Sequence, residues 1–153
     1  MTSEPKGSEN HLPQWVEDLL RTKQTLVLAT CKDNAPYCSL MCFTQISGER
    51  SVLLVTARGS AKFTNMQANE EVSLLMADEI SFASGRPRGK VVTFLGRASE
   101  VAGEERPRLE SVFVAKFPGL AAFARDASSA LVRVRLTSAV ISGDVRHATH
   151  YPL

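Results

Sequence analysis

The segment Val55–Lys62, which reads Val-Thr-Ala-Arg-Gly-Ser-Ala-Lys, gathers residue types that bind anions. An apolar run ends at Thr56, a glycine turn follows, and Ser60 is a favourable N-cap for a helix. Free backbone N–H groups at such a helix start favour a phosphate dianion. Arg58 can bind phosphate oxygens through two N–H groups, and Lys62 adds a point charge. A capped helix with a solvated basic rim explains the same residues more simply, and the spacing is not that of a P-loop.

The histidines offer weaker chemistry. His147 and His150 stand three positions apart near the C-terminus, so they could share a helical face or bind a metal. Without neighbouring cysteine or carboxylate ligands they are interpreted as surface residues. His11 lies in a polar segment. We find neither a serine–histidine–acid arrangement nor a carboxylate pair suited to acid–base catalysis, so no catalytic residue and no metal ligand is assigned.

The three cysteines are Cys31, Cys38 and Cys42. Cys38 and Cys42 are four positions apart on a predicted strand, which places them on one face but too far apart for a disulfide. Buried apolar thiols are the expected state, and a redox thiol is the alternative. An odd number of cysteines and a polar start without the apolar core of a secretory signal predict a cytoplasmic protein.

Length and composition set the class of protein. The chain has 153 residues, 44% of them hydrophobic and 22% charged, which predicts one globular domain over residues 12–153 behind a flexible tail of residues 1–11. A formal net charge of +2 with no basic cluster argues against a nucleic-acid partner. The apolar runs are shorter than the ~20 residues of a membrane-spanning helix, so no membrane partner is expected.

The elements that must position these residues follow from periodicity and turn signals. Helices are predicted over Pro13–Thr22, Ser60–Asn69 and Glu104–Phe117, with a short apolar turn at Leu120–Phe123. Strands are predicted over Gln24–Cys31, Tyr37–Ile46, Ser51–Ala57, Glu71–Ala77, Val91–Val101 and Ala130–Ile141. Between two of them, Ser81–Lys90 is predicted to be a mobile loop, and Gly96 to mark a bulge or a close backbone approach.

Six strands with hairpin-type links and a few short helices predict a mainly β protein, a compact antiparallel barrel. An α+β sandwich is the alternative. A doubly wound parallel sheet is disfavoured because the first links are too short for crossover helices.

The stretch Leu26–Val101 resembles the FMN-binding split-barrel family, which is related to pyridoxamine 5'-phosphate oxidase and to the small bacterial FMN-binding proteins. The resemblance is carried by the order of several short motifs over roughly half of the chain. These are Ala29-Thr30, Pro36 before Tyr37-Cys38-Ser39-Leu40, Thr56, Ser60-x-Lys62, Asn65-Met66, Asn69-Glu70-Glu71-Val72-Ser73-Leu74 and Phe94-x-Gly96-x-Ala98.

The resemblance implies a six-stranded antiparallel Greek-key split barrel that forms a homodimer, with flavin mononucleotide (FMN) at the subunit interface. It implies cofactor-binding roles for nine residues. Arg58, Ser60, Ala61 and Lys62 would bind the phosphate, Thr56 the phosphate or ribityl chain, and Ser39, Leu40, Met41 and Cys42 would lie along the isoalloxazine ring. The Arg-rich loop Gly85–Lys90 would reach the flavin of the other subunit or close over it.

The function implied is that of a small FMN-dependent oxidoreductase with an unidentified redox partner. The alternatives are a flavin-binding or electron-transfer module without turnover, a split barrel that binds haem or a deazaflavin, and a scaffold that has lost its flavin. The chain lacks the Trp-containing C-terminal segment of pyridoxamine 5'-phosphate oxidase, and its one tryptophan, Trp15, falls in the first predicted helix. Oxidation of pyridoxamine phosphate is therefore not assigned.

Overall fold

The computed structural model describes residues 11–144 and 147–153, so the expected N-terminal tail lies outside the described residues except for its last position. The helices are α1 (Gln14–Thr22), α2 (Ala61–Ala68), α3 (Glu105–Lys116), the 3-10 turn η1 (Pro118–Leu120) and α4 (Ala121–Arg125). The strands are β1 (Thr25–Lys32), β2 (Ala35–Cys42), β3 (Thr44–Gln45), β4 (Ser51–Ala57), β5 (Glu71–Ser81), β6 (Arg88–Glu100), β7 (Ser129–Asp144) and β8 (His147–Pro152). The three predicted helices are present, each within one residue of its predicted bounds.

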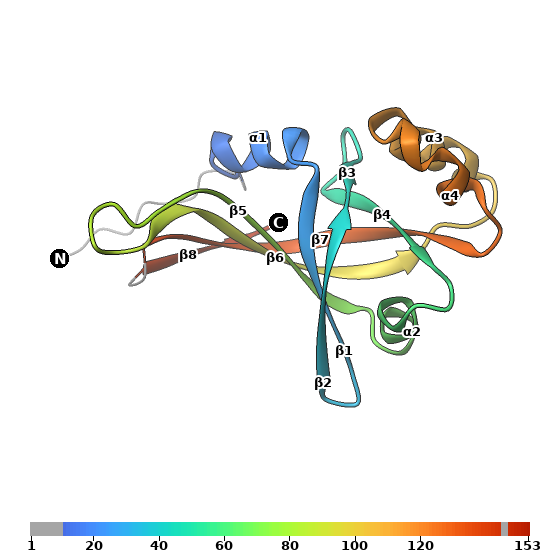
Figure 1. Cartoon of the computed structure of the whole chain (residues 1–153), viewed down its shortest axis with the longest axis horizontal. Helices are drawn as coiled ribbons and strands as arrows, with labels where there is room; N and C mark the ends of the chain where they lie inside the picture. Colours follow the sequence, from blue (N-terminus) through green and yellow to red (C-terminus); the bar gives the residue numbers. More distant parts are fainter. Residues whose placement is uncertain (1–10, 145–146) are drawn as a thin grey trace.

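The strands form one antiparallel sheet that closes on itself (Figure 1). Neighbouring strands follow the order β2, β1, β5, β6, β7, β4, β3, and β8 also pairs with β7. A single residue, Phe43, separates β2 from β3. The two ends of this order are therefore one continuous stretch of chain, which pairs first with β1 and then with β4 and so closes a barrel.

The mainly β, antiparallel barrel class is confirmed, but the sheet has eight strands where six were predicted. Part of the difference is the interruption at Phe43, which divides one predicted strand into β2 and β3. The other part is β8, which was not predicted because its sequence, His-Ala-Thr-His-Tyr-Pro, lacks the apolar alternation of a half-buried strand.

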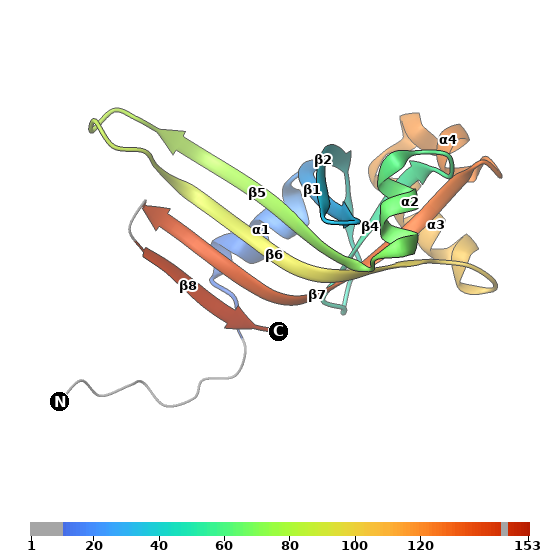
Figure 2. The ribbon, with the colours of Figure 1, turned by 90° about the horizontal axis from the view of Figure 1, so that it is seen from below.

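Beyond the barrel, β5, β6, β7 and β8 run side by side as an extended arm (Figure 2). The pairing of Ser81 with Arg88 carries β5 and β6 well into the predicted loop Ser81–Lys90, which is therefore shorter than predicted. An ion pair of 3.1 Å between Lys90 and Glu79 joins the two strands near the tip. This tip lies at the opposite end of the molecule from α2 (Figure 2).

The core consists of two apolar clusters that share β4. Val52 and Leu54 face the barrel interior, while Leu53 and Val55 face a second cluster against α3 and α4. Burial of β4 on both faces is the state that its continuous apolar run Val52–Val55 indicates. The second cluster packs α3 and α4 against β4 and so fixes these helices at the outside of the barrel.

The apolar side of α1 packs on the barrel cluster through Val16, Leu19 and Leu20. An ion pair of 2.6 Å between Glu17 and Arg50 ties the same helix to the turn before β4. Within the described residues, no helix combines the length and apolarity that crossing a membrane requires.

Gly96 lies where the register between β6 and β7 shifts. A Cβ at this position would be 2.7 Å from the Arg135 carbonyl oxygen and 2.8 Å from Val134 Cγ1. The prediction that Gly96 marks a bulge or a close backbone approach is therefore confirmed, and the structure shows both.

Candidate functional site

The start of α2 has the geometry of an anion site. Ser60 is the N-cap, and its Oγ accepts a hydrogen bond from the Phe63 N–H at 3.3 Å. Thr56 Oγ1 lies 2.9 Å from Ser60 Oγ, so two hydroxyls join the end of β4 to the helix cap. The backbone N–H groups of Ala61 and Lys62 have no backbone acceptor in the part of the chain that the structure describes. These two amides are therefore available to an anion.

A pocket of about 330 Å³ opens beside this helix start. We call it the β2/β4 pocket. Its lining comes from β2, β4, the start of α2 and the helices that follow β6, and consists of Leu40, Met41, Cys42, Val55, Thr56, Ala57, Ser60, Lys62, Phe113, Leu120 and Phe123. Its volume is at the lower end of the ~300–1,000 Å³ typical of small-molecule sites. Because its polar groups gather at α2 and the remaining wall is mostly apolar, the pocket suits a ligand with an anionic end and an apolar body.

The apolar wall includes three side chains that the sequence did not identify as site residues, Phe113, Leu120 and Phe123. Phe113 is buried in the second core cluster, Leu120 packs against that cluster, and Phe123 is 42% exposed. No local sequence signal marks them, because their position beside β2 depends on how α3 and α4 pack on β4.

Six of the nine predicted cofactor residues line the β2/β4 pocket: Leu40, Met41, Cys42, Thr56, Ser60 and Lys62. Ala61 is exposed in the first turn of α2 and directs its backbone N–H to the same end. Ser39 pairs with the fully buried Leu28, so its side chain faces the barrel interior. The predicted set is thus drawn together from β2, β4 and α2, with Ser39 able to contribute its backbone.

Arg58, the ninth predicted residue, directs its guanidinium elsewhere. Its Nη2 lies 2.6 Å from Glu100 Oε1, and its Nε donates to the Ala127 carbonyl oxygen at 3.1 Å. Its Cζ is 5.9 Å from the centre of the Phe63 ring. The guanidinium is therefore held on the side of the turn that faces β6.

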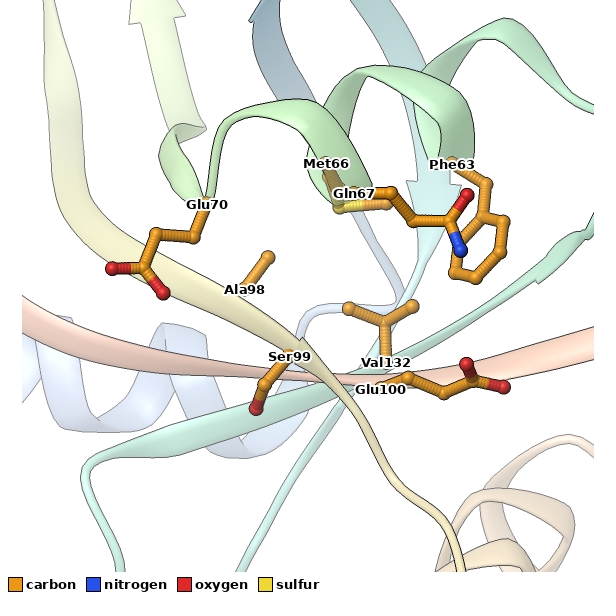
Figure 3. A pocket seen from close by; sticks show the side chains of 8 residues that line it. All are labelled: Phe63, Met66, Gln67, Glu70, Ala98, Ser99, Glu100 and Val132. Carbon is orange, nitrogen blue, oxygen red and sulfur yellow. The ribbon is translucent and has the colours of Figure 1, made fainter.

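A second cavity of about 220 Å³, which we call the α2/β6 pocket, lies between α2 and β6 (Figure 3). It is lined by Phe63, Met66, Gln67, Glu70, Ala98, Ser99, Glu100 and Val132. Its two carboxylates are already paired, Glu100 with Arg58 and Glu70 with Arg97 at 3.3 Å. Because these charges are compensated within the chain, the β2/β4 pocket is the stronger candidate site.

Lys116 of α3 has a structural role close to this site. Its Nζ donates to the Lys23 carbonyl oxygen and lies 4.5 Å from the centre of the Phe43 ring. Partial burial lowers the pKa of the Lys116 ammonium from its ordinary value, and the electrostatic interaction with Cys42 opposes this shift. The contacts attach α3 to the connection between α1 and β1, which keeps the helical wall of the pocket in place.

The structure also places the remaining candidates. Cys38 is exposed and Cys31 and Cys42 are half-buried, so the expectation of buried thiols is wrong. Cys31 and Cys38 lie near the exposed hairpin of β1 and β2, and Cys42 packs at the border of the second core cluster. His147 and His150 lie on β8, where positions three apart face opposite sides, and no shared helical face exists. Of the three cysteines, Cys42 alone lines the β2/β4 pocket.

Comparison with known proteins identifies the family and the fold of the chain. The family model described as pyridoxamine 5'-phosphate oxidase matches residues 12–142. A Schizosaccharomyces pombe protein described as a pyridoxamine 5'-phosphate oxidase homolog is 32% identical over 79 residues, which cover 46% of this chain and 42% of that protein. The match thus spans less than half of the length of this curated relative.

Solved structures share the fold at low sequence identity. General Stress Protein 26 from Bacillus anthracis has a TM-score of 0.68 at 18% identity, covering 92% of this chain and 97% of its own. HutZ, a haem storage protein from Vibrio cholerae, has a TM-score of 0.68 at 17% identity, covering 90% and 93%. ChuZ from Campylobacter jejuni has a TM-score of 0.73 at 14% identity, covering 91% of this chain and 58% of that one.

The family match covers most of the chain, including the barrel strands, the start of α2 and the helical wall of the pocket. The chain belongs to the pyridoxamine 5'-phosphate oxidase family.

Proposed function

We propose that this chain binds FMN in the β2/β4 pocket and acts as a small flavin-dependent oxidoreductase. The observation that carries the proposal is that one pocket contains both the anion-binding start of α2 and an apolar wall. The family resemblance implies that Thr56, Ser60 and Lys62 at the polar end bind the same cofactor as Leu40, Met41 and Cys42.

The residues at the polar end fit a phosphate group. The free Ala61 and Lys62 amides and the Thr56 and Ser60 hydroxyls meet there, and Lys62 also lines the pocket. Backbone N–H groups at a helix start, a hydroxyl and a cation are the donors that a phosphate dianion requires. We therefore assign Lys62, rather than Arg58, as the principal cation of this end.

The apolar end fits a planar ring. Met41, Val55 and Phe113 form an apolar wall, and the soft sulfur of Met41 packs well on aromatic faces. Along its length β2 pairs with β1 on one edge, and within the described residues its other edge is open. Backbone groups on this open edge can bind the polar side of the ring, which is the role expected for Ser39–Cys42.

FMN, when bound, would supply hydride or electron transfer at its N5. The chain's own residues would bind the phosphate, orient the ring against β2 and β4, and exclude water through the Phe113 and Phe123 wall. Backbone donors beside the ring would stabilise negative charge on it. No catalytic side chain is assigned.

We also propose that two copies of the chain assemble through one outer face of the barrel. Val27 pairs with Leu40 on one side and with Leu75 on the other, so these three side chains share a face. Leu40 is 72% exposed, Leu75 is 39% exposed, and Leu95 on the same face is 43% exposed. An apolar row of this kind is typical of an interface between protein chains.

The same row reaches the proposed flavin site, because Leu40 belongs both to the row and to the lining of the β2/β4 pocket. A second copy seated on the row would cover the open side of the pocket and shield the ring from water. This is the arrangement that the resemblance implies for the family.

Haem is the alternative ligand that the relatives raise, because HutZ is described as a haem storage protein. The β2/β4 pocket is lined by no histidine among the described residues, and His150 lies on β8 in the arm. The phosphate-type donors at α2 favour FMN over haem in this pocket.

The absorbance spectrum of the purified chain, recorded with and without added FMN, tests the proposal. We expect flavin bands, and Lys62→Ala to weaken FMN binding about tenfold while riboflavin binding changes little, because riboflavin lacks the phosphate. Lys23→Ala is the matched control, since Lys23 lies between α1 and β1 and carries the same charge.

A haem Soret band with no response to FMN would overturn the assignment in favour of haem. Equal weakening of FMN and riboflavin by Lys62→Ala would show that the phosphate is held elsewhere. Consumption of NAD(P)H in the presence of an electron acceptor would separate an oxidoreductase from a flavin-binding module without turnover.

A further inference from the structure

Arg58 occupies an unusual position for a phosphate-binding residue. It follows Ala57, which lines the β2/β4 pocket, and precedes the Ser60 cap by two positions. Its backbone is therefore beside the proposed phosphate site, while its guanidinium lies against β6. A rotation of its long side chain, without movement of the backbone, would bring the charge to the other side of the turn.

Two side chains of the α2/β6 pocket hold the guanidinium away from the phosphate end. The Glu100 carboxylate binds Arg58 at 2.6 Å, and the Phe63 ring lies 5.9 Å from its Cζ. In Figure 3 both side chains lie at the same end of that pocket. The Ala127 carbonyl oxygen is the third contact.

We propose that Glu100 and the phosphate group of the cofactor compete for Arg58, an inference that rests on the proposed flavin site. The side chains of Arg58 and Glu100 are 41% and 30% exposed. Water therefore screens the ion pair, and little free energy is needed to break it. A phosphate dianion carries more charge than a carboxylate and accepts two parallel N–H bonds from a guanidinium. Glu100 is thus a positioning residue that sets the affinity of the pocket for phosphorylated ligands.

The competition affects one class of ligand. Only a ligand with a phosphate gains Arg58, so Glu100 lowers the affinity for FMN and leaves that for riboflavin unchanged. A purely structural ion pair would instead alter both affinities together, through the shape of the turn. The ratio of the two affinities therefore distinguishes competition from a structural role.

The test measures the dissociation constants of FMN and riboflavin by fluorescence titration of the full chain. Glu100→Gln is expected to tighten FMN binding about two- to fivefold, the worth of an exposed ion pair, with riboflavin unchanged. Glu70→Gln is the matched control. It also removes a carboxylate of the α2/β6 pocket, but that carboxylate pairs with Arg97 and not with Arg58. In an Arg58→Ala background, Glu100→Gln should have no effect on FMN binding.

If Glu100→Gln binds FMN with unchanged or lower affinity, the proposed competition is wrong. It is also wrong if Glu100→Gln still changes FMN binding in the Arg58→Ala background. If Glu100→Gln does not fold, Glu100→Asp, which retracts the carboxylate by one methylene, should tighten FMN binding in the same direction. Failure of the wild-type chain to bind FMN would overturn the proposed flavin site itself, which separates the two conclusions.

Discussion

The hydroxyl oxygens of Thr56 and Ser60 lie 2.9 Å apart, and they share a single hydrogen bond. Two hydroxyls carry two protons, and the bond between them uses one. Because Ser60 Oγ also accepts from the Phe63 N–H, the remaining proton is available to a ligand whichever hydroxyl is the donor. The pair therefore stabilises the cap of α2 and still presents one O–H donor to the phosphate end of the pocket.

Thr56→Val tests this donor. Thr56 is buried, and valine has nearly its shape, so the change removes one hydroxyl with little repacking. We expect FMN to bind about three- to tenfold more weakly, as measured by fluorescence titration, because one hydrogen bond is lost. Thr44→Val in β3, a buried threonine that does not line the pocket, should leave FMN binding unchanged.

Equal losses in the two variants would show that the effect comes from the barrel and not from the site. Riboflavin provides a second comparison, because the Thr56 hydroxyl is placed at the phosphate end. The Thr56→Val change should weaken the binding of riboflavin less than it weakens the binding of FMN.

Gly96→Ala is expected to lower the free energy of unfolding by about 1–3 kcal/mol, the usual cost of overpacking a tight site. The new methyl group would be 2.7 Å from the Arg135 carbonyl oxygen, and backbone on both strands must move to admit it. Chemical denaturation measures the change. Gly119→Ala is the control, since nothing lies within 4 Å of its Cβ position.

A Gly96→Ala variant as stable as the wild type would contradict the close approach of β6 and β7. It would mean that the bulge has enough freedom to open at no cost.

Local features of the structure could be predicted from the sequence, because each depends on neighbouring residues. The bounds of α1, α2 and α3, the Ser60 cap of α2, the double burial of β4 and the bulge at Gly96 all follow from short-range patterns. The converging set at the start of α2 followed in the same way, since Thr56, Ser60 and Lys62 are only six positions apart.

Features that depend on distant pairing could not be predicted. The direction of Arg58 is decided by Glu100, which is 42 positions away, and nothing near either residue signals their ion pair. Strand β8 forms because β7 offers it a free edge, although its own residues are mostly exposed and polar. The apolar wall of the pocket likewise exists because α3 and α4 fold back onto β4.

Glu105 is expected to make the free energy of unfolding depend on pH in the acid range. The hydrogen bond from Arg133 of β7 lowers the pKa of the Glu105 carboxyl below its ordinary value of 4.5. A lowered pKa in the folded state means that the unfolded chain binds the proton more tightly. The stabilisation is therefore complete above pH 4.5 and is lost as the pH falls through the lowered pKa.

Glu105→Gln should therefore be less stable than the wild type at pH 7, with a difference that shrinks below pH 4.5. Thermal unfolding at a series of pH values measures it. Glu104→Gln removes the same charge one position earlier and leaves the hydrogen bonds from Arg133 to Glu105 in place, so it is the control. A difference between Glu105→Gln and the wild type that is independent of pH would exclude the ion pair with Arg133 as its cause.

Leu75→Glu tests whether two copies associate through the apolar row of Leu40, Val27 and Leu75. Leu75 is 39% exposed and does not line the β2/β4 pocket, so a carboxylate there would act on the interface and not on the site. Burying that unpaired charge between two copies is costly, and we expect the mass measured by light scattering to fall from dimer to monomer. Ser111→Glu, on the exposed surface of α3, should remain a dimer.

FMN binding should weaken in the monomeric Leu75→Glu variant because the open side of the pocket is no longer covered. A Leu75→Glu variant that keeps the mass of a dimer would place the interface on another face of the barrel.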